Sequence, residues 1–380
     1  MLTPAEKTHL LNYKYQGGDN SLLMRFFLRP FIYNPIVRVL PKNLAPNVIT
    51  VVGILATVIG YLVTIYVFPQ FPDEDTSYAP VPWLSFLLAA CLFIYQTCDN
   101  IDGPHARNIA CCSHVGDFLD HAGDQIAFFT FITSLTTTFF TGPTLLSAFS
   151  VLSVMWAGWF AQWETLYMGK LVLAPINGCM EGIFTGVMIH VGFGLFPDIP
   201  ISHVTLPAVG TVSVGQVIAL VSAVGGVTLG PTASLVSVFK KLGPRAYARS
   251  LMTHFPYLVL NGLCFATALL DPAVRAHVPH AWMSLHGVLI CYIIMNLIIH
   301  RLVGRPFPLL QPAILLAVVP FAVAVSNKLN PVPFEVRVNV MVICAVFAAV
   351  MFAVKFLKVA SDISAASGKP LWTVPKTKRD

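Results

Sequence analysis

Acidic residues in one short stretch of an apolar chain are the first candidates for chemistry. Five of the twelve aspartates lie in this stretch, which we call the aspartate stretch: Asp99, Asp102, Asp117, Asp120 and Asp124. At helical spacing the first two share one face of a helix, and the last three share another. A charged side chain near a bilayer costs about 2.5–3.5 kcal/mol and is usually functional. Two helices joined by a short turn would form a carboxylate cage suited to a hard cation such as Mg²⁺ or Mn²⁺.

Glycine and arginine residues between the acids indicate a phosphorylated ligand. Gly103 and Gly116 have no side chain, so backbone or ligand can approach closely. Arg107 carries a planar guanidinium that matches the geometry of a phosphate. The stretch therefore predicts metal-assisted chemistry on a phosphorylated substrate.

The composition places this stretch in a membrane protein. Of the 380 residues, 56% are hydrophobic and 11% are charged, and the mean hydropathy is +0.74. Soluble domains carry about 25% charged residues. The net charge of +6 comes mainly from bases in short connections, where they orient membrane proteins, so we expect no nucleic-acid partner. The sequence predicts an all-α polytopic membrane protein with a cytosol-facing site for two metal ions.

Apolar runs long enough to cross about 30 Å of hydrocarbon occur about ten times. We expect transmembrane helices at residues 47–69, 82–103, 116–140, 143–165, 176–196, 212–239, 253–270, 280–300, 307–326 and 336–357. The third run begins with acids and the sixth is rich in Gly and Ser, so these two carry the weakest signal.

Basic residues concentrate in alternate connections between these runs. They lie before the first run and after the second, sixth, eighth and tenth, whereas residues 71–80 hold three acids and no base. By the positive-inside rule, both termini and the aspartate stretch face the cytosol. Three bases on the other side are exceptions: Arg275, Lys328 and Arg337.

The chain divides into four predicted regions. They are a cytosolic or interfacial segment (1–46), a catalytic helical core (47–240), additional transmembrane helices with a possible dimer interface (241–360) and a basic cytosolic tail (361–380). Within residues 18–46, apolar side chains alternate with Arg25 and Arg29, which is typical of an interfacial amphipathic helix.

The aspartate stretch resembles the signature of the CDP-alcohol phosphotransferase family, D-x2-D-G-x2-A-R-x8-G-x3-D-x3-D. Its fixed positions are filled by Asp99, Asp102, Gly103, Ala106, Arg107, Gly116, Asp120 and Asp124. Further landmarks at 14–15, 45–50, 163–169 and 177–182 are similar to the eukaryotic choline/ethanolamine phosphotransferase branch. Two departures leave the choice of head group open. Pro104-His105 stands where that branch commonly has Lys-Gln, and Ala122 and Gln125 replace a usual Gly and Ser.

The resemblance implies transfer of a phospho-alcohol from a cytidine diphosphate carrier to a lipid hydroxyl. The implied donor is CDP-ethanolamine or CDP-choline, and the implied acceptor is diacylglycerol in the membrane. Two Mg²⁺ or Mn²⁺ ions would be bound by Asp99, Asp102, Asp120 and Asp124, with Asp117 as a further ligand or an outer group. A homodimer in the endoplasmic reticulum or Golgi, with the later spans as its seam, is also implied.

Candidate binding and catalytic residues follow from the same resemblance. The donor would be held by Arg107, with Asn47, Gly103, Ala106 and Gly116 lining its pocket. A base has to take the proton of the acceptor hydroxyl, and His121 and Asp124 are both candidates. The head group would meet either the carboxylates Glu164 and Glu181 or an aromatic cage of Trp156, Trp159 and Trp163. Carboxylates suit a primary ammonium, whereas an aromatic cage suits a quaternary one.

Other functions fit parts of the pattern. A relative with another head group, such as inositol, or another lipid acceptor would keep the same signature, although such relatives are usually shorter. A cation transporter would use the acids as a transport site, but it predicts discontinuous helices and often inverted repeats. Neither is visible, and transport does not explain Gly103, Ala106, Arg107 and Gly116 together. A relative that has lost its activity is a third alternative.

Overall fold

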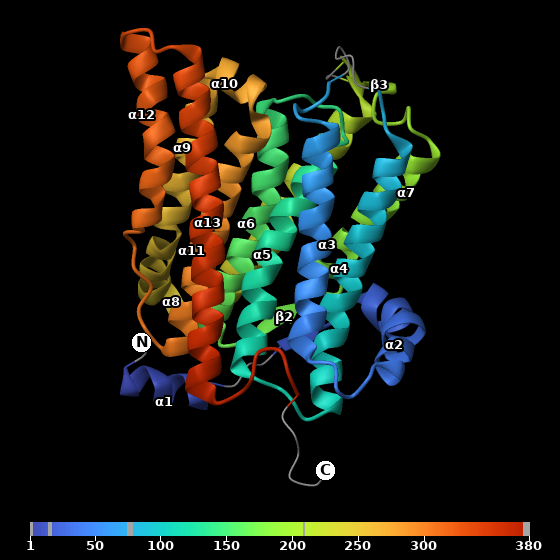
Figure 1. Ribbon diagram of the computed structural model, residues 1–380, viewed down its shortest axis with the longest axis vertical. Coiled ribbons are helices and arrows are strands. Elements are labelled where there is room, and N and C mark those ends of the chain that lie inside the picture. Colours follow the sequence, from blue (N-terminus) through green and yellow to red (C-terminus); the bar gives the residue numbers. More distant parts are fainter. Residues whose placement is uncertain (1–2, 14–16, 74–78, 208–209, 375–380) are drawn as a thin grey trace.

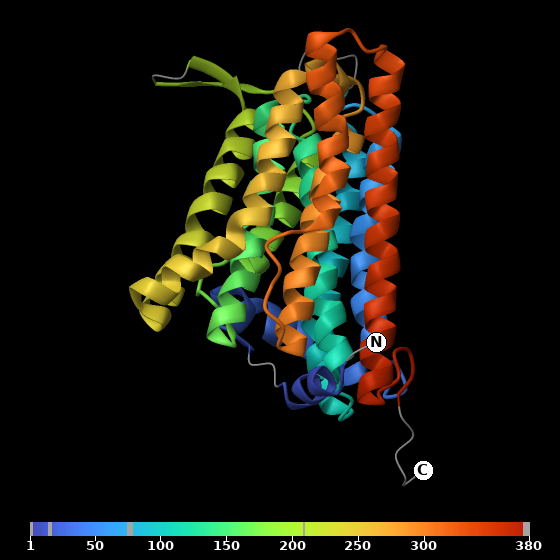
Figure 2. The ribbon, with the colours of Figure 1, turned by 90° about the vertical axis from the view of Figure 1, so that its left-hand side faces the viewer.

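The computed structural model describes residues 3–13, 17–73, 79–207 and 210–374, which form a bundle of long helices (Figures 1 and 2). The chain is an all-α polytopic membrane protein. Its helices are α1 Pro4–Asn12, η1 Met24–Tyr33, α2 Asn34–Val39, α3 Pro46–Val67, α4 Pro82–Asn108, α5 His114–Thr137, α6 Leu145–Met168, η2 Gly178–Gly182, α7 Ile183–Leu195, α8 Val214–Leu251, η3 Met252–His254, α9 Phe255–Leu270, α10 Pro272–His277, α11 Pro279–Val303, η4 Pro312–Ile314, α12 Leu315–Leu329 and α13 Phe334–Ser367.

Four short strands form two small sheets outside the bundle. Strands β1 (Gly17–Asp19) and β2 (Leu171–Leu173) pair in parallel, with Gly17 opposite Leu171. Strands β3 (His203–Leu206) and β4 (Gly210–Ser213) pair antiparallel, with His203 opposite Ser213, and project from the end of the bundle opposite α1 (Figure 2). The first sheet therefore ties the N-terminal segment to the chain that follows α6.

The ten predicted spans fall on helices α3 to α9 and α11 to α13. In the described part of the chain, eight stretches are long and apolar enough to cross a membrane, and one of them, Val214–Leu270, covers both α8 and α9. Helix α5, which begins with the acids, is not among the eight. The count of ten spans therefore stays a prediction, whereas the multi-pass architecture is established.

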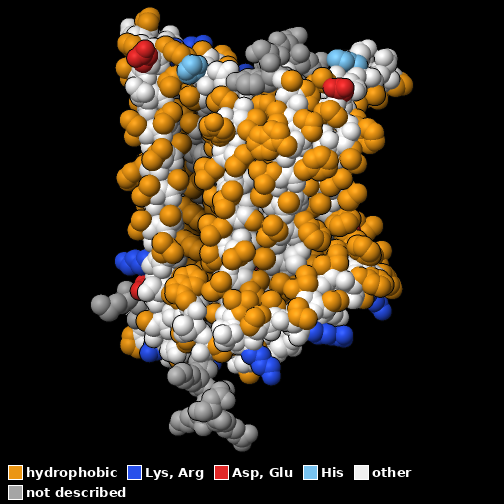
Figure 3. Space-filling view, turned by 45° about the vertical axis from the view of Figure 1, so that its right-hand side comes forward, with side chains coloured by type: hydrophobic (Ala, Val, Ile, Leu, Met, Phe, Trp, Pro, Cys, Tyr) orange, Lys and Arg blue, Asp and Glu red, His pale blue; other side chains and the backbone are white. Residues whose placement is uncertain are grey.

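These helices differ in how much of their length is buried in the core. In the most apolar 18 residues of α11, 83% are buried, which is typical of a helix at the centre of a bundle; the corresponding share in α13 is 28%. The flank of the molecule is covered by apolar side chains, and most Lys and Arg on the visible face gather near the α1 end (Figure 3). We call this end the basic end.

The N-terminal helix α1 packs on the basic end of α11. Glu6 forms an ion pair with Arg305, and Nδ1 of His9 lies 3.1 Å from the carbonyl oxygen of Leu302. Helix α11 ends at Val303 and is capped by Gly304, which has a φ of 71°. A Cβ at this position would lie 2.5 Å from the His9 ring, so glycine is needed both for the backbone conformation and for the docking of α1.

The segment predicted to lie on the membrane surface forms η1 and α2. Phe26 and Phe31 of η1 are 65% and 69% exposed, while Leu28 is fully buried. Helix α13 continues to Ser367, so residues 361–367 of the predicted C-terminal tail are helical. Lys14, Tyr15 and residues 375–380 lie outside the described residues.

Helices α4 and α5 are antiparallel neighbours because only residues 109–113 connect them. Helix α5 begins where the Ser113 hydroxyl accepts a 3.1 Å hydrogen bond from the Gly116 amide, a standard N-cap. Helix α4 continues through Pro104 to Asn108, so Asp99 and Asp102 lie in its last turns. The short connection places both acidic faces at the basic end of the bundle.

Candidate active site

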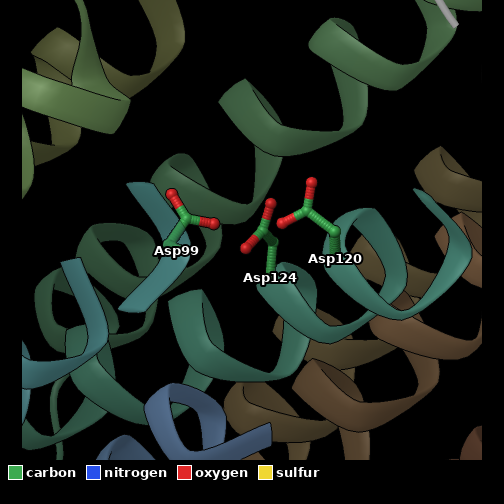
Figure 4. Close-up of side chains that lie close together, drawn as sticks. All are labelled: Asp99, Asp120 and Asp124. Carbon is green, nitrogen blue, oxygen red and sulfur yellow. The ribbon is translucent and has the colours of Figure 1, made fainter. Parts of the chain in front are cut away.

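Three aspartates converge between α4 and α5, and we call them the carboxylate trio: Asp99, Asp120 and Asp124. One oxygen from each lies within 4.8 Å of the others. The three carboxylates face one another across the gap between the two helices, Asp99 from α4 and the other two from α5 (Figure 4). All three side chains are half-buried.

The spacing of the trio suits a single hard cation. Oxygens on opposite sides of a bound Mg²⁺ or Ca²⁺ stand about 4–5 Å apart, since each metal–oxygen bond is about 2.0–2.6 Å. Without a cation, two ionised carboxylates 4 Å apart repel by about 4 kcal/mol at an effective dielectric constant of 20. The donor set therefore fits a divalent ion both in geometry and in charge.

Hydroxyl groups from two helices hold the carboxylates around this gap. The Tyr95 hydroxyl donates a 2.7 Å hydrogen bond to Oδ1 of Asp124. The Thr50 hydroxyl of α3 donates to Oδ2 of Asp102, which is only 6% exposed. Asp102 lies one turn beyond Asp99 on α4 and is not one of the three carboxylates of the trio.

His121 and Asp117 form a second contact on the face of α5. Nε2 of His121 lies 3.3 Å from Oδ1 of Asp117, and Nδ1 lies 3.8 Å from Oδ2 of Asp120. The His121 side chain is buried. The imidazole therefore bridges a carboxylate of the trio and a carboxylate outside it, and Asp117 lies nearer to the histidine than to the trio.

Asn47 connects the starts of two helices with the C-terminal segment. Its amide nitrogen donates a 2.8 Å hydrogen bond to the carbonyl oxygen of Leu371. A Cβ on Gly116 would lie 3.2 Å from Oδ1 of Asn47, so the absence of a side chain at Gly116 lets the two elements meet. A small pocket here is lined by Ala45, Pro46, Asn47, Cys111, Ser113, Lys369, Pro370, Leu371 and Thr373.

Arg107 lies over the last turns of α4. Its side chain is exposed, whereas Ala106 beside it is buried. A Cβ on Gly103 would be 3.4 Å from Nη1 of Arg107. The guanidinium therefore covers the bare face of Gly103, the residue after Asp102, and is exposed to an incoming anion.

The predicted head-group residues are engaged with other parts of the chain. Glu181 accepts from the Ser21 hydroxyl (2.6 Å) and from the amide nitrogens of Leu23 and Asn177 (3.2 and 2.9 Å). Glu164 accepts a 2.8 Å bond from Ser234 of α8. Glu181 therefore fastens the N-terminal segment to η2.

The predicted tryptophan cage is part of an aromatic cluster in the core. Trp159 and Trp163 are fully buried, and the Trp159 indole nitrogen donates to Nδ1 of His254 at 2.7 Å. Trp163 donates to the Ser250 carbonyl at 3.1 Å. Both indole N–H groups therefore already have partners, one at the end of α8 and the other in η3.

Part of the chain is similar to a known protein family. Residues 43–192, which carry α3 to α6 and most of α7 together with the carboxylate trio, match the family model of CDP-alcohol phosphatidyltransferase. The match covers less than half of the chain.

The homologues of the chain include named phosphotransferases. It is 28% identical over 327 residues, 85% of its own length and 74% of the relative's, to "Uncharacterized CDP-alcohol phosphatidyltransferase class-I family protein 2" of Dictyostelium discoideum. It is 31% identical over 191 residues to "Cholinephosphotransferase 1" and 32% identical over 212 residues to "Choline/ethanolaminephosphotransferase 1", both of Saccharomyces cerevisiae. These two matches cover 50% and 55% of the chain, and 47% and 51% of the yeast proteins.

Two site residues escaped the sequence reasoning, Thr50 and Tyr95. Thr50 lies in the landmark 45–50, but nothing in that pattern assigns it to Asp102. Tyr95 is four residues before Asp99, so helical spacing alone puts it on the same face of α4. That spacing was the available signal.

Proposed function

We propose that the protein transfers phosphoethanolamine or phosphocholine from CDP-ethanolamine or CDP-choline to diacylglycerol, giving phosphatidylethanolamine or phosphatidylcholine and CMP. The observation that carries the proposal is the carboxylate trio at the mouth of a gap between two membrane helices. The match of residues 43–192 to the family model and the similarity to the two named yeast proteins support it. The same end of the bundle carries most of the visible bases, which supports a cytosolic orientation. The proposed compartment is the endoplasmic reticulum or Golgi.

The proposed binding of the donor uses residues of both helices and of α3. Asp99, Asp102, Asp120 and Asp124 would hold one or two Mg²⁺ or Mn²⁺ ions, which neutralise the diphosphate and the leaving CMP when bound. Arg107 would hold a donor phosphate through its exposed guanidinium. Asn47, Gly103, Ala106 and Gly116 would border the nucleotide, and Asn47 would then exchange its bond to Leu371 for one to the ligand.

The proposed reaction forms one phosphorus–oxygen bond and breaks another. The acceptor hydroxyl oxygen attacks the phosphorus that carries the head-group alcohol, and the bond from that phosphorus to CMP breaks. The hydroxyl proton goes to a base. His121 suits this role because Asp117 and Asp120 flank its two ring nitrogens. Asp124, which accepts a hydrogen bond from the Tyr95 hydroxyl, is the other candidate for the base.

The test is a transfer assay on the purified full chain in diacylglycerol-containing vesicles. We expect Mg²⁺- or Mn²⁺-dependent release of CMP from CDP-ethanolamine, CDP-choline or both, with formation of the matching phospholipid. Comparing the donors fixes the head group. Folded protein that releases CMP from neither donor, while using another CDP-alcohol or another lipid acceptor, would show the related reaction instead. Cation flux without CMP release would show a transporter, which the match to the family model does not favour.

A further inference from the structure

A recess beside α10 is a feature that the proposed reaction does not use. It lies at the end of the bundle opposite α1 (Figure 1), whereas the carboxylate trio lies at the basic end. Its lining comes from all five helices from α9 to α13. The free space is about 10 Å³, which is room for one water-sized group. We call this feature the α10 recess.

The charged side chains of the α10 recess carry a net positive charge. Arg275 and Arg337 line it, and Asp271 is the acid among the described lining residues. Oδ1 of Asp271 accepts a 2.5 Å hydrogen bond from Nη1 of Arg337 and a 3.3 Å bond from the amide of Val274. The carboxylate is therefore paired with one guanidinium, and the charge of Arg275 has no acid of its own in the described lining.

Two N–H groups of the lining residues lack an acceptor. Nη1 of Arg275 donates to the Ala268 carbonyl at 3.3 Å, but Nε is buried and has no hydrogen-bond partner among the described residues. Trp282 is only 1% exposed, and its indole nitrogen is likewise buried and unpartnered within the described part of the chain. A buried donor without an acceptor destabilises a fold. A ligand that brings an acceptor would remove this cost.

The chemistry of these donors selects an anionic oxygen. Arginine and tryptophan side chains donate hydrogen bonds and accept none. A water molecule could accept from both, but it would leave the charge of Arg275 without compensation. A phosphate oxygen accepts several hydrogen bonds and also carries negative charge, and such charge-assisted bonds are the stronger kind. The recess therefore suits one oxygen of a phosphate group whose other atoms remain outside.

The surroundings of the α10 recess favour a phosphate that carries acyl chains. Helices α9 and α12 pack against each other, and beside the lining their surface is apolar: Leu269 is 62% exposed and Val319 is 45% exposed. The lining residue Ala324 lies about 8 Å before the end of α12 at Leu329. The recess is therefore close to the helix ends, where the phosphates of a bilayer are expected.

We propose that the α10 recess binds the phosphate of a membrane phospholipid in the leaflet opposite the basic end. One phosphate oxygen accepts hydrogen bonds from Nε of Arg275 and from the indole nitrogen of Trp282, and the acyl chains lie along α9 and α12. Arg337 keeps its pairing with Asp271. This inference does not depend on the proposed transfer reaction, which uses the other end of the bundle.

A lipid titration of the purified full chain tests the site. Delipidated protein in detergent is titrated with dioleoylphosphatidylglycerol, and native mass spectrometry counts the bound lipids. We expect Arg275→Gln to weaken the binding of one lipid by about 10-fold or more, because a charged donor is lost. Trp282→Phe keeps an aromatic ring without the N–H and should weaken it by about threefold. Lys328→Gln, which removes an exposed base at the same end, is the matched control and should stay within about twofold.

Two results of the titration would overturn the proposal. Lipid affinity that is the same in the native, Arg275→Gln and Trp282→Phe proteins would show that the recess holds no phosphate. Inorganic phosphate is the second probe, with the thermal unfolding temperature as the readout. If it protects the native protein as well as the lipid does, and does not protect Arg275→Gln, the ligand is a free anion and the acyl chains have no part.

A density map of the native protein tests the site without any variant, so it remains decisive if Arg275→Gln does not fold. In cryo-electron microscopy of the lipid-loaded protein, we expect phosphate density beside Nε of Arg275 that continues into acyl chains over α9 and α12. An isolated water-sized density in the recess, or none at all, would overturn the proposal.

Discussion

Carboxylates that are buried or half-buried lie at both ends of the bundle, and their charges are balanced differently at the two ends. Away from the basic end, Asp271 is 5% exposed and forms a 2.5 Å ion pair with Nη1 of Arg337. At the basic end, the carboxylate trio places three acids around one gap, supported by the Tyr95 hydroxyl. The first arrangement is complete within the chain, whereas the second gathers like charges. An acid paired with a cation of the chain stabilises the fold, whereas acids that repel one another are expected to be stabilised by a bound cation.

The comparison also explains a sequence exception. Arg337 is an exception to the positive-inside pattern. Its ion pair with Asp271 compensates the free-energy cost of placing its charge there. Arg275, a second exception, donates to the Ala268 carbonyl at 3.3 Å. These bases fasten α9, α10 and α13 together, so they give little information about orientation.

The largest effect on turnover is expected when one charge is removed from the trio. We expect Asp120→Asn to lower the rate of CMP release by about 10²–10³-fold or more, since it removes a charged group that acts on the reacting phosphates. The thermal unfolding temperature should stay or rise, because one of three like charges is gone. Turnover and unfolding are both measured in detergent. Retained turnover would exclude the trio as the active site.

Removing the acid at the other end should have the opposite effect. Asp271→Asn leaves the half-buried Arg337 without its carboxylate partner, a loss that costs up to about 3–5 kcal/mol in a fully buried pair. We expect a lower unfolding temperature and near-native turnover at low temperature. Lys328→Gln is the control, because Lys328 is exposed at the same end and its loss should change little. A folded, stable Asp271→Asn protein without turnover would contradict the division between the two ends.

A smaller effect is expected from the hydroxyl that supports the trio. Tyr95→Phe removes the donor to Asp124 while keeping the ring, so we expect metal affinity or kcat to fall by about 10- to 100-fold. Titration of activity with Mn²⁺ separates a loss of metal affinity from a loss of kcat. Tyr61→Phe is the matched control, since that hydroxyl lies 3.0 Å from Ser284 on α11. Equal effects of the two variants would assign both hydroxyls to stability alone.

The smallest effect is expected in the second half of α5. The Thr133 hydroxyl donates a 2.7 Å bond to the Phe129 carbonyl of its own helix, so it needs no outside partner. We expect Thr133→Val to change turnover by less than about twofold and stability by less than about 1 kcal/mol. Rates are measured in the same transfer assay. A large loss of turnover would mean that α5 carries functional groups over its whole length.

The sequence was most informative where spacing determines geometry. The i, i+3 and i, i+7 positions of the aspartates and the short connection 109–113 were enough to predict that α4 and α5 bring acids together. Apolar runs located the long helices, because each needs a minimum length of apolar chain to cross the bilayer. The acids at the start of α5 are also why this helix fails the simple criteria for a span.

Contacts between distant segments could not be read from the sequence. The bond from Asn47 to Leu371 joins residues 324 positions apart, and no local pattern encodes such a distance. Glu181 was expected near a head group, but its neighbours come from the N-terminal segment through Ser21 and Leu23. Polar residues with one chemistry suit several partners, and only the packing of the chain selects among them.

The docking of α1 on α11 has a consequence for biosynthesis. Glu6 and His9 meet partners 299 and 293 residues further along the chain. A ribosome adding about 5–20 residues per second needs about 15 to 60 seconds to produce those partners. During that interval α1 has no binding surface, because the end of α11 has not yet been synthesised. A ribosome that stalls before α11 therefore leaves an undocked N-terminus, which quality-control factors can recognise.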